Sequence, residues 1–318
     1  MSSGHGHNGH GHGVSANADQ RWLLGALGLI VVFMAAEVGI GIAAGSLALL
    51  SDAAHMLTDA AAIALAVWAI RLAALPAKGR MTYGWKRAEI LSALANGLTL
   101  LLLAAWLAYE AIERLITPPE VTGGLVLVTA LAGVVVNVAA TWMISKANRS
   151  SLNVEGAFQH ILNDLFAFIA TAVAGLVMLL TGFARADAIA SLVVVALMIK
   201  AGVSLVRESS RIILEAAPAG LDPVAIGQVM AGRPDVSEVH DLHIWEITSG
   251  QPALSAHVLV RPGRDCHAVR TDLATLLAAK HDIEHTTLQV DHATPSPRAP
   301  GEHCDTAHGP VHRATATP

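Results

Sequence analysis

Two histidine–aspartate pairs with the same spacing interrupt otherwise apolar stretches of the chain. His55 and Asp59 lie in SLALLSDAAHMLTDAAA, and His160 and Asp164 lie in AFQHILNDLFAF. Residues four apart stand one above the other on a helix, so each pair presents two ligand groups from one face. If the two faces meet, two imidazoles and two carboxylates converge. That set suits a tetrahedral, borderline-soft cation such as Zn²⁺ better than Mg²⁺ or Ca²⁺.

Neither pair has a basic partner on its own segment, because residues 47–70 and 157–180 contain no Lys or Arg. A charged Asp at the centre of a membrane-spanning helix costs about 3 kcal/mol on insertion scales, and such residues usually pair or mark a transport route. We therefore expect an imported cation to be the partner, with protons replacing it when it leaves. Asp52 is a candidate proton relay or a cavity-lining residue, and a structural polar contact is the alternative for any single pair.

The composition is that of a membrane protein: 53% of the 318 residues are hydrophobic and 14% are charged, against roughly 25% charged residues in an average soluble domain. Each of six apolar segments has the roughly 20 residues that a helix needs to cross a bilayer. We predict an α-helical polytopic membrane protein whose transmembrane domain, residues 21–207, has six transmembrane helices. The segments are 22–44, 47–70, 90–112, 121–144, 157–180 and 186–206.

Basic residues gather in the connections on one side of these segments. The connection between the second and third segments is the richest, and the positive-inside bias places it in the cytoplasm. Both termini are then cytoplasmic, and no signal peptide is expected in front of the first apolar segment. The basic residues on this side are Arg71, Lys78, Arg80, Lys86, Arg87, Lys146, Arg149, Arg207 and Arg211.

The composition becomes that of a soluble domain from Glu208, and residues 208–293 are predicted to form a cytoplasmic α+β domain of ferredoxin-like type. Asp222 and Pro223 begin a helix that runs to about Gly232. VSEVHDLHIWEIT and PALSAHVLV then alternate as strands. A helix over residues 265–280 and a last strand, HTTLQVDH, complete the order helix, strand, strand, helix, strand.

The two ends of the chain are predicted to be disordered tails, residues 1–20 and 294–318, because their compositions cannot bury a core. Each carries candidate metal collectors, although a dispensable tail or an expression tag is the alternative for the first. The two cysteines, Cys266 and Cys304, are too few for a disulfide scaffold, which favours a reducing compartment. The candidate collectors are His5, His7, His10, His12, His303 and Cys304.

Four motifs together resemble the zinc-transporting branch of the cation diffusion facilitator family, over nearly the whole chain. They are SLALLSDAAHMLTDAAA, YGWKRAEILSALANG, EGAFQHILNDLFAF and VHDLHIWEITSGQPALSAHVLV. The resemblance implies a homodimeric, proton-coupled antiporter in a bacterial inner membrane, with six transmembrane helices and a ferredoxin-like cytoplasmic domain. It also implies that His55, Asp59, His160 and Asp164 are the transport ligands. Lys86 stands where many relatives carry a histidine, so we expect no metal site in that loop.

The same resemblance implies a second metal site in the cytoplasmic domain, at His240, His257, His285 and Asp291. His240 and His257 fall on adjacent predicted strands and the last strand supplies the other two, while ordinary surface histidines are the alternative. Less certain neighbours are His243, Cys266, His267 and His292, with His308 a further candidate in the tail.

The function that these features predict is efflux of Zn²⁺ from the cytosol in exchange for protons, as part of metal resistance. Imidazole titrates near neutrality and metal ligands must be deprotonated, so zinc and protons compete for one site. No metalloprotease or nucleophile-elbow motif occurs, and we do not expect an enzyme. A membrane metal sensor without flux is an alternative, as is transport of cadmium, cobalt, nickel or iron. Membrane lipid, metal ions and a second copy of the chain are the expected partners, and nucleic acid is not one.

Overall fold

The computed structural model describes residues 16–44, 47–117, 123–183, 185–293 and 309–313. The chain divides between Val206 and Arg207 into two compact units, which are taken in turn. The predicted tail residues His5, His7, His10, His12, His303, Cys304 and His308 lie outside the described residues.

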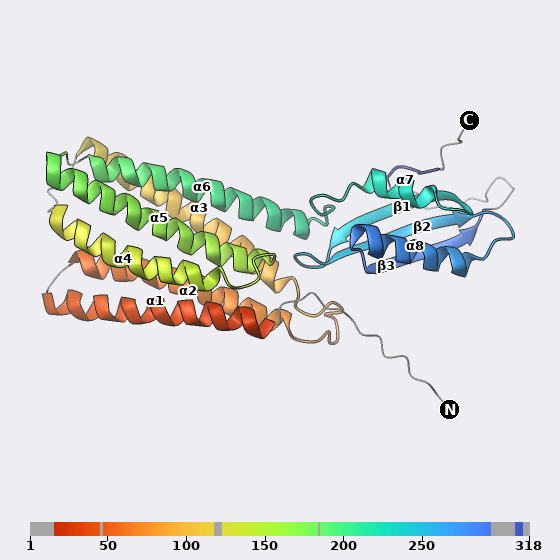
Figure 1. Cartoon of the computed structure of the whole chain (residues 1–318), viewed down its shortest axis with the longest axis horizontal. Helices are drawn as coiled ribbons and strands as arrows, with labels where there is room; N and C mark the ends of the chain where they lie inside the picture. Colours follow the sequence, from red (N-terminus) through yellow and green to blue (C-terminus); the bar gives the residue numbers. More distant parts are fainter. Residues whose placement is uncertain (1–15, 45–46, 118–122, 184, 294–308, 314–318) are drawn as a thin grey trace, which may run out of the picture. The chain divides into compact units, whose positions relative to one another are not determined.

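The first unit is helical (Figure 1). Among the residues whose side chains are described, four helices are long and apolar enough to cross a membrane, namely α3, α4, α5 and α6, whereas the apolar stretch of α1, Gln20–Ala36, is shorter. Six spans therefore stay a prediction. The helices are α1 (Ala16–Ala44), α2 (Leu47–Ala73), α3 (Ala88–Ile116), α4 (Gly123–Ile144), α5 (Leu152–Thr181) and α6 (Ala186–Ile213).

The start of α1 differs from the prediction of a disordered tail up to residue 20. The helix begins at Ala16, and ANADQ contains no Gly or Pro that would end it in front of the apolar run. The first apolar segment and the end of the predicted tail thus form one helix.

Two buried clusters hold the helical unit together. The first joins α1, α2, α4 and α5 around Ile30, Ile63, Ile144 and Ile161. The second joins α3 and α6, whose backbones approach closely at two glycines: a Cβ on Gly202 would lie 3.0 Å from the carbonyl oxygen of Gly97. Small residues at such crossings are typical of helices packed in a membrane.

The outer surface of this unit is apolar, which is the reverse of a soluble protein. Large side chains such as Leu102, Trp106, Val135 and Leu180 are exposed on it. An exposed apolar surface of this kind needs a non-aqueous environment. The helices satisfy their own backbone hydrogen bonds, which is the condition for lying in lipid.

The second unit is a small α+β domain with the predicted element order. Its sheet has the order β1-β2-β3, in which β1 and β2 are antiparallel and β2 and β3 are parallel, with α8 as the connection. The elements are α7 (Pro223–Ala231), β1 (Val236–Glu246), β2 (Pro252–Val260), α8 (Cys266–His281) and β3 (His285–His292).

Alternation and capping explain why this domain could be predicted. Leu254 and Val258 of β2 point into a core that also contains Met230 of α7 and Leu273 of α8. The opposite face of the sheet is left more open. Strand β1 ends two residues before the predicted end, because Ile247 N–H donates to the carbonyl of Gln251 in a turn.

An ion pair joins the residues just before β1 to α8. The Arg233 guanidinium donates two hydrogen bonds to Asp272, of 2.7 and 2.5 Å, and these bonds lower the pKa of that carboxyl. Both side chains are more than one-third exposed, so the pair contributes less than about 1 kcal/mol to stability.

The described C-terminal residues, 309–313, also differ from the prediction of a disordered tail. His312 forms a β-bridge with Val239 of β1. A free sheet edge offers unpaired N–H and C=O groups to any extended segment, and sequence composition does not reveal such a partner.

The contribution of the N-cap residue of α8 can be tested by mutation. Asp265 accepts hydrogen bonds from the N–H groups of His267 and Ala268, at 2.8 and 3.2 Å. We expect Asp265→Ala to destabilise α8 by about 1 kcal/mol, seen as faster amide hydrogen exchange in its first two turns. Asp265→Asn keeps a capping oxygen and should exchange like the parent; equal exchange in all three proteins would contradict this role.

Candidate metal centre

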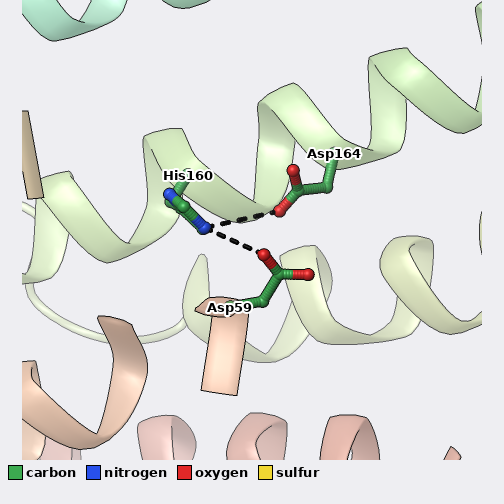
Figure 2. A group of neighbouring side chains, drawn as sticks. All are labelled: Asp59, His160 and Asp164. Atoms are coloured by element: carbon green, nitrogen blue, oxygen red, sulfur yellow. Dashed lines mark hydrogen bonds and ion pairs between the residues drawn. The ribbon is translucent and has the colours of Figure 1, made fainter. Parts of the chain in front are cut away.

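Three of the four residues predicted as a membrane metal site come together between α2 and α5. His160 Nε2 lies 3.0 Å from Asp59 Oδ1 and 3.9 Å from Asp164 Oδ2. Figure 2 shows the imidazole edge directed at both carboxylates, with Asp59 on α2 and the other two residues on α5. One ligand atom from each residue lies within 4.8 Å of the others, which is close enough for one cation to contact all three.

The fourth predicted ligand, His55, lies on α2 one turn before Asp59. Its side chain, like that of Asp52, lies outside the described side chains, and so the geometry of the site is that of the other three. The i and i+4 spacing on α5 does place His160 and Asp164 on one face, as the sequence predicts.

The three described ligands are almost completely buried, with exposed fractions of 2% for Asp59, 1% for His160 and 5% for Asp164. Two carboxylates this close together repel in a medium of low dielectric constant, and burial of a charge is costly unless it is paired. Helix α5 contains no Lys or Arg, and Arg71 of α2 stands more than three turns beyond Asp59. A bound cation or a proton can supply the compensating charge at this point.

A hydrogen bond two turns away sets how α5 sits against α2. Asn153 is fully buried, and its Nδ2 donates to the carbonyl oxygen of Ala66 at 2.8 Å. Asn153 precedes His160 by seven residues and Ala66 follows Asp59 by seven, as expected for antiparallel neighbours. The bond thus fixes the register that brings His160 opposite Asp59. This bond could not be predicted from the sequence, since its acceptor is a backbone carbonyl.

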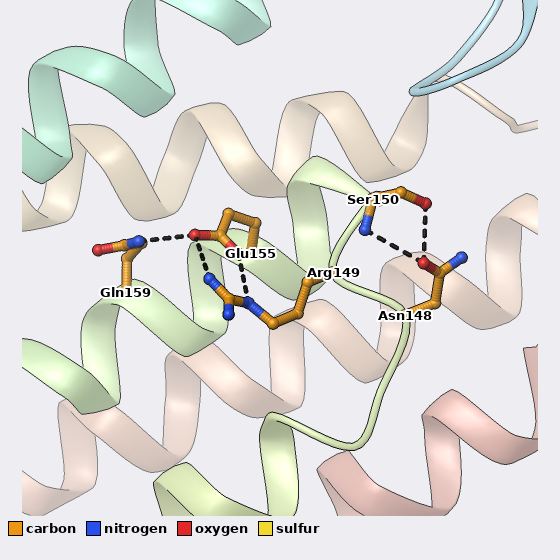
Figure 3. Close-up of polar contacts among 5 residues, drawn as sticks. All are labelled: Asn148, Arg149, Ser150, Glu155 and Gln159. Carbon is orange, nitrogen blue, oxygen red and sulfur yellow. Dashed lines mark hydrogen bonds and ion pairs between the residues drawn. The ribbon is translucent and has the colours of Figure 1, made fainter.

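The start of α5 is fixed by a polar network at its first turns (Figure 3). Arg149 donates to both carboxylate oxygens of Glu155, at 2.8 and 3.1 Å, and its guanidinium lies 3.7 Å from the ring centre of Phe158. Gln159, next to His160, donates to the same carboxylate at 2.6 Å. Asn148 accepts from the backbone N–H of Ser150 and closes the preceding turn.

In the cytoplasmic-type domain, the structure brings together only part of the predicted ligand group. His240 and His257 are register partners on β1 and β2, and their rings lie edge to face with centroids 5.4 Å apart. On β3, however, Gln289 is the partner of His257, while His285 pairs with Ala253. His285 is therefore roughly 13 Å along the strand from His257, too far to share an ion with it.

Asp291, the other predicted ligand on β3, lies diagonally from His257, opposite Leu259, and its Oδ2 accepts from the Gln289 amide at 3.0 Å. The parallel register of β2 and β3 is the physical reason for this arrangement. Register of this kind cannot be derived from the strand sequences alone.

Carboxylates of β1 take the places beside the histidine pair. Glu238 Oε1 lies 3.2 Å from His240 Nδ1, and Asp241 lies 2.8 Å from His243 Nε2 and 3.7 Å from His257 Nε2. Simple alternation would put Asp241 on the opposite face from His240. A bulge between His240 and His243, where Asp241 has φ of 51°, reverses this.

A separate contact involves two of the less certain neighbours. Cys266 Sγ at the start of α8 lies 3.5 Å from His292 Nε2 at the end of β3, and the same nitrogen lies 2.9 Å from the carbonyl oxygen of Arg264. Within the described residues, the group of Asp59, His160 and Asp164 is the one in which three ligand atoms converge.

Both units match the models of known protein domains. Residues 23–214 match the model of the cation efflux transmembrane domain, and residues 218–293 match that of the cation efflux protein cytoplasmic domain. The zinc transporter ZitB of Escherichia coli (strain K12) is 35% identical over 294 residues, which cover 92% of this chain and 93% of that protein.

Two further relatives are similar over most of their length. The metal cation efflux system protein CzcD of Cupriavidus metallidurans is 35% identical, covering 96% of this chain and 94% of its own. The cadmium, cobalt and zinc/H(+)-K(+) antiporter of Bacillus subtilis is 34% identical, with 89% and 88% covered.

The register bond of Asn153 leads to a prediction about the site. We expect Asn153→Ala to weaken Zn²⁺ binding at the α2–α5 site by about fivefold, because loss of one buried hydrogen bond costs about 1 kcal/mol and loosens the ligand geometry. Zinc titration of the purified chain measures this. Thr181→Ala removes a hydroxyl bond at the far, exposed end of the same helix and serves as the control. Unchanged affinity in Asn153→Ala would show that the register does not depend on this bond.

Proposed function

The chain belongs to the cation efflux family, and from that premise we propose that it exports Zn²⁺ from the cytosol in exchange for protons. As a member of this family it is a multi-pass membrane transporter and not an enzyme. The observation that carries the proposal is the buried group of Asp59, His160 and Asp164 between α2 and α5. We assign these residues, together with His55, as the ligands of the transported ion.

The proposal includes a membrane arrangement. Helices α1 to α6 each span the bilayer, both termini face the cytoplasm, and the α+β domain is a cytoplasmic domain of ferredoxin-like type. The match of residues 218–293 to a cytoplasmic domain supports this orientation, as do the basic connections. Two copies assemble as a homodimer. Residues 1–20 and 294–308 supply the metal collectors.

The contact between His160 and Asp59 supports proton coupling. An imidazole nitrogen and a carboxylate oxygen both carry lone pairs, so a separation of 3.0 Å is attractive only when a proton lies between them. A metal ion bound to Nε2 needs the same lone pair, and the proton then has to leave. The cation and the proton thus compete for one atom, and an inward proton gradient can drive the ion out.

The ligand types narrow the range of ions. Imidazole nitrogen with carboxylate oxygen suits zinc, cobalt, nickel and cadmium better than magnesium or calcium, whose preferred ligands are all oxygen. The names of the relatives support zinc first, with cadmium and cobalt next. Zinc is placed ahead of nickel and iron because these names include zinc and neither of the other two.

A membrane metal sensor is the competing function, because the same ligands could bind zinc without moving it. The two differ in one measurement. A transporter reconstituted in vesicles carries zinc across the membrane, whereas a sensor binds zinc and gives no flux.

Removal of one charge from the site tests the proposal. We expect Asp59→Asn to reduce proton-driven zinc flux in vesicles by more than about tenfold, since even an outer-shell partner of a metal ligand is worth that much. Glu110→Gln, on the exposed side of α3 beside Arg114, is a matched control and should transport like the parent. Asp59→Asn vesicles that exchange zinc for protons at the parent rate would refute the assignment.

A second test concerns the ligand whose side chain is not described. We expect His55→Asp to lower the preference for Zn²⁺ over Mn²⁺, because a carboxylate oxygen in place of imidazole favours harder ions. Flux measured for each ion in the same vesicles gives the ratio. A ratio equal to that of the parent would mean that His55 does not contact the transported ion.

A further inference from the structure

The C-terminal segment 309–313, hereafter the strap, is drawn beside α7 of the α+β domain in Figure 1, and its His312 forms an antiparallel β-bridge with Val239 of β1. Val239 N–H donates to the carbonyl oxygen of His312 at 2.9 Å, and His312 N–H donates to that of Val239 at 2.8 Å. Strand β1 has β2 on its other side. The strap therefore covers the one edge of β1 that the sheet leaves open.

The side chain of His312 fills a notch on α7. It is only 5% exposed, and it packs directly over Gly227: a Cβ at that position would lie 2.4 Å from His312 Cδ2 and 2.5 Å from Nε2. Any residue other than glycine would occupy the space of the imidazole. The notch is thus matched in shape to this side chain, whereas the neighbouring Val311 is exposed.

Arg313 makes the third contact, with a carboxylate on β1. Its Nε and Nη2 donate to Glu238 Oε2 at 3.0 and 2.8 Å, and the Glu238 side chain is largely buried. A buried carboxylate is costly unless a cation pairs with it. The two backbone bonds, the notch and this ion pair are three separate interactions with adjacent residues of the strap.

The same carboxylate connects the strap to the histidine pair. Oε1 of Glu238 lies 3.2 Å from His240 Nδ1, while Oε2 receives Arg313. The positive charge of Arg313 therefore partly neutralises the carboxylate nearest to His240. A cation placed at His240 would therefore meet a carboxylate whose charge the strap already partly neutralises.

We propose that the edge of β1, Gly227 and Glu238 form a docking site for an extended His-Arg segment, and that the strap of the same chain is its occupant. Docking weakens cation binding at His240 and His257, and a cation bound there loosens the strap, because such coupling is reciprocal. Fifteen residues separate Ala293 from Gly309, a length that can reach roughly 50 Å, so the chain is long enough to supply its own strap. This inference does not depend on the transport activity.

Amide hydrogen exchange of the full chain in detergent tests the docking. Truncation after His308 and, separately, Gly227→Ala should each speed exchange at Val239 by about tenfold, as expected when a local edge contact opens. Alanine is a better helix former than glycine, so Gly227→Ala removes the notch without weakening α7. Truncation after Arg313 keeps the strap and should leave exchange unchanged.

A peptide of sequence GPVHR added to the chain truncated after His308 should restore protection at Val239, and GPVAA should not. Unchanged exchange after loss of the strap would overturn the proposal. Protection that disappears on dilution of the full chain would show that a second copy supplies the strap, and would overturn the assignment of the occupant.

The coupling is tested with zinc alone, in an Asp59→Asn background that removes the membrane site. We expect Arg313→Ala to tighten zinc binding to the α+β domain severalfold, and Arg264→Ala, which removes an exposed arginine paired with Asp235, to leave it unchanged. Equal or weaker binding in Arg313→Ala would contradict competition for Glu238.

Discussion

The buried imidazole of His160 lies between two carboxylates, and this arrangement requires a particular packing of the helices in the helical unit. His160 cannot approach Asp59 within 3.0 Å unless α2 and α5 are in contact and in the right register. Asn153 fixes that register through Ala66, and the ion pair of Arg149 with Glu155 fixes where α5 begins. These polar contacts of α5 position the site, while apolar side chains make up the cluster that joins α1, α2, α4 and α5.

Much of this site could be predicted because the residue types, His and Asp, and their i and i+4 spacing indicate a metal site. A pair at i and i+4 shares a helix face whatever the fold, and an apolar segment without Lys or Arg shows that an Asp lacks a local counter-charge. That α2 meets α5 depends on tertiary packing, which the spacing does not contain. The role of Asn153 could not be predicted, because a side chain that binds a distant backbone carbonyl has no sequence signature.

The α+β domain likewise has some features that could be predicted from the sequence and others that could not. Its helices and strands follow from the N-caps at Asp222 and Asp265 and from alternation, and these are local properties. The ligand group was less predictable because it depends on register and on one bulge. A shift at Asp241 turns a carboxylate toward the histidines, and the parallel register of β3 moves His285 away from them.

The two histidine groups use similar ligands in different surroundings, and the difference in burial determines how each responds to a cation. Between α2 and α5 water is excluded, so the negative charge has to be balanced by an ion or a proton at the site itself. On the sheet, solvent reaches the histidines, with 51% of the His243 side chain and 31% of the His257 side chain exposed. The carboxylates of Asp241 and Glu238 are largely buried there, and Arg313 supplies a counter-charge to Glu238. Compensating charge therefore has to enter the buried group itself, whereas on the sheet part of it comes from a side chain that solvent can reach.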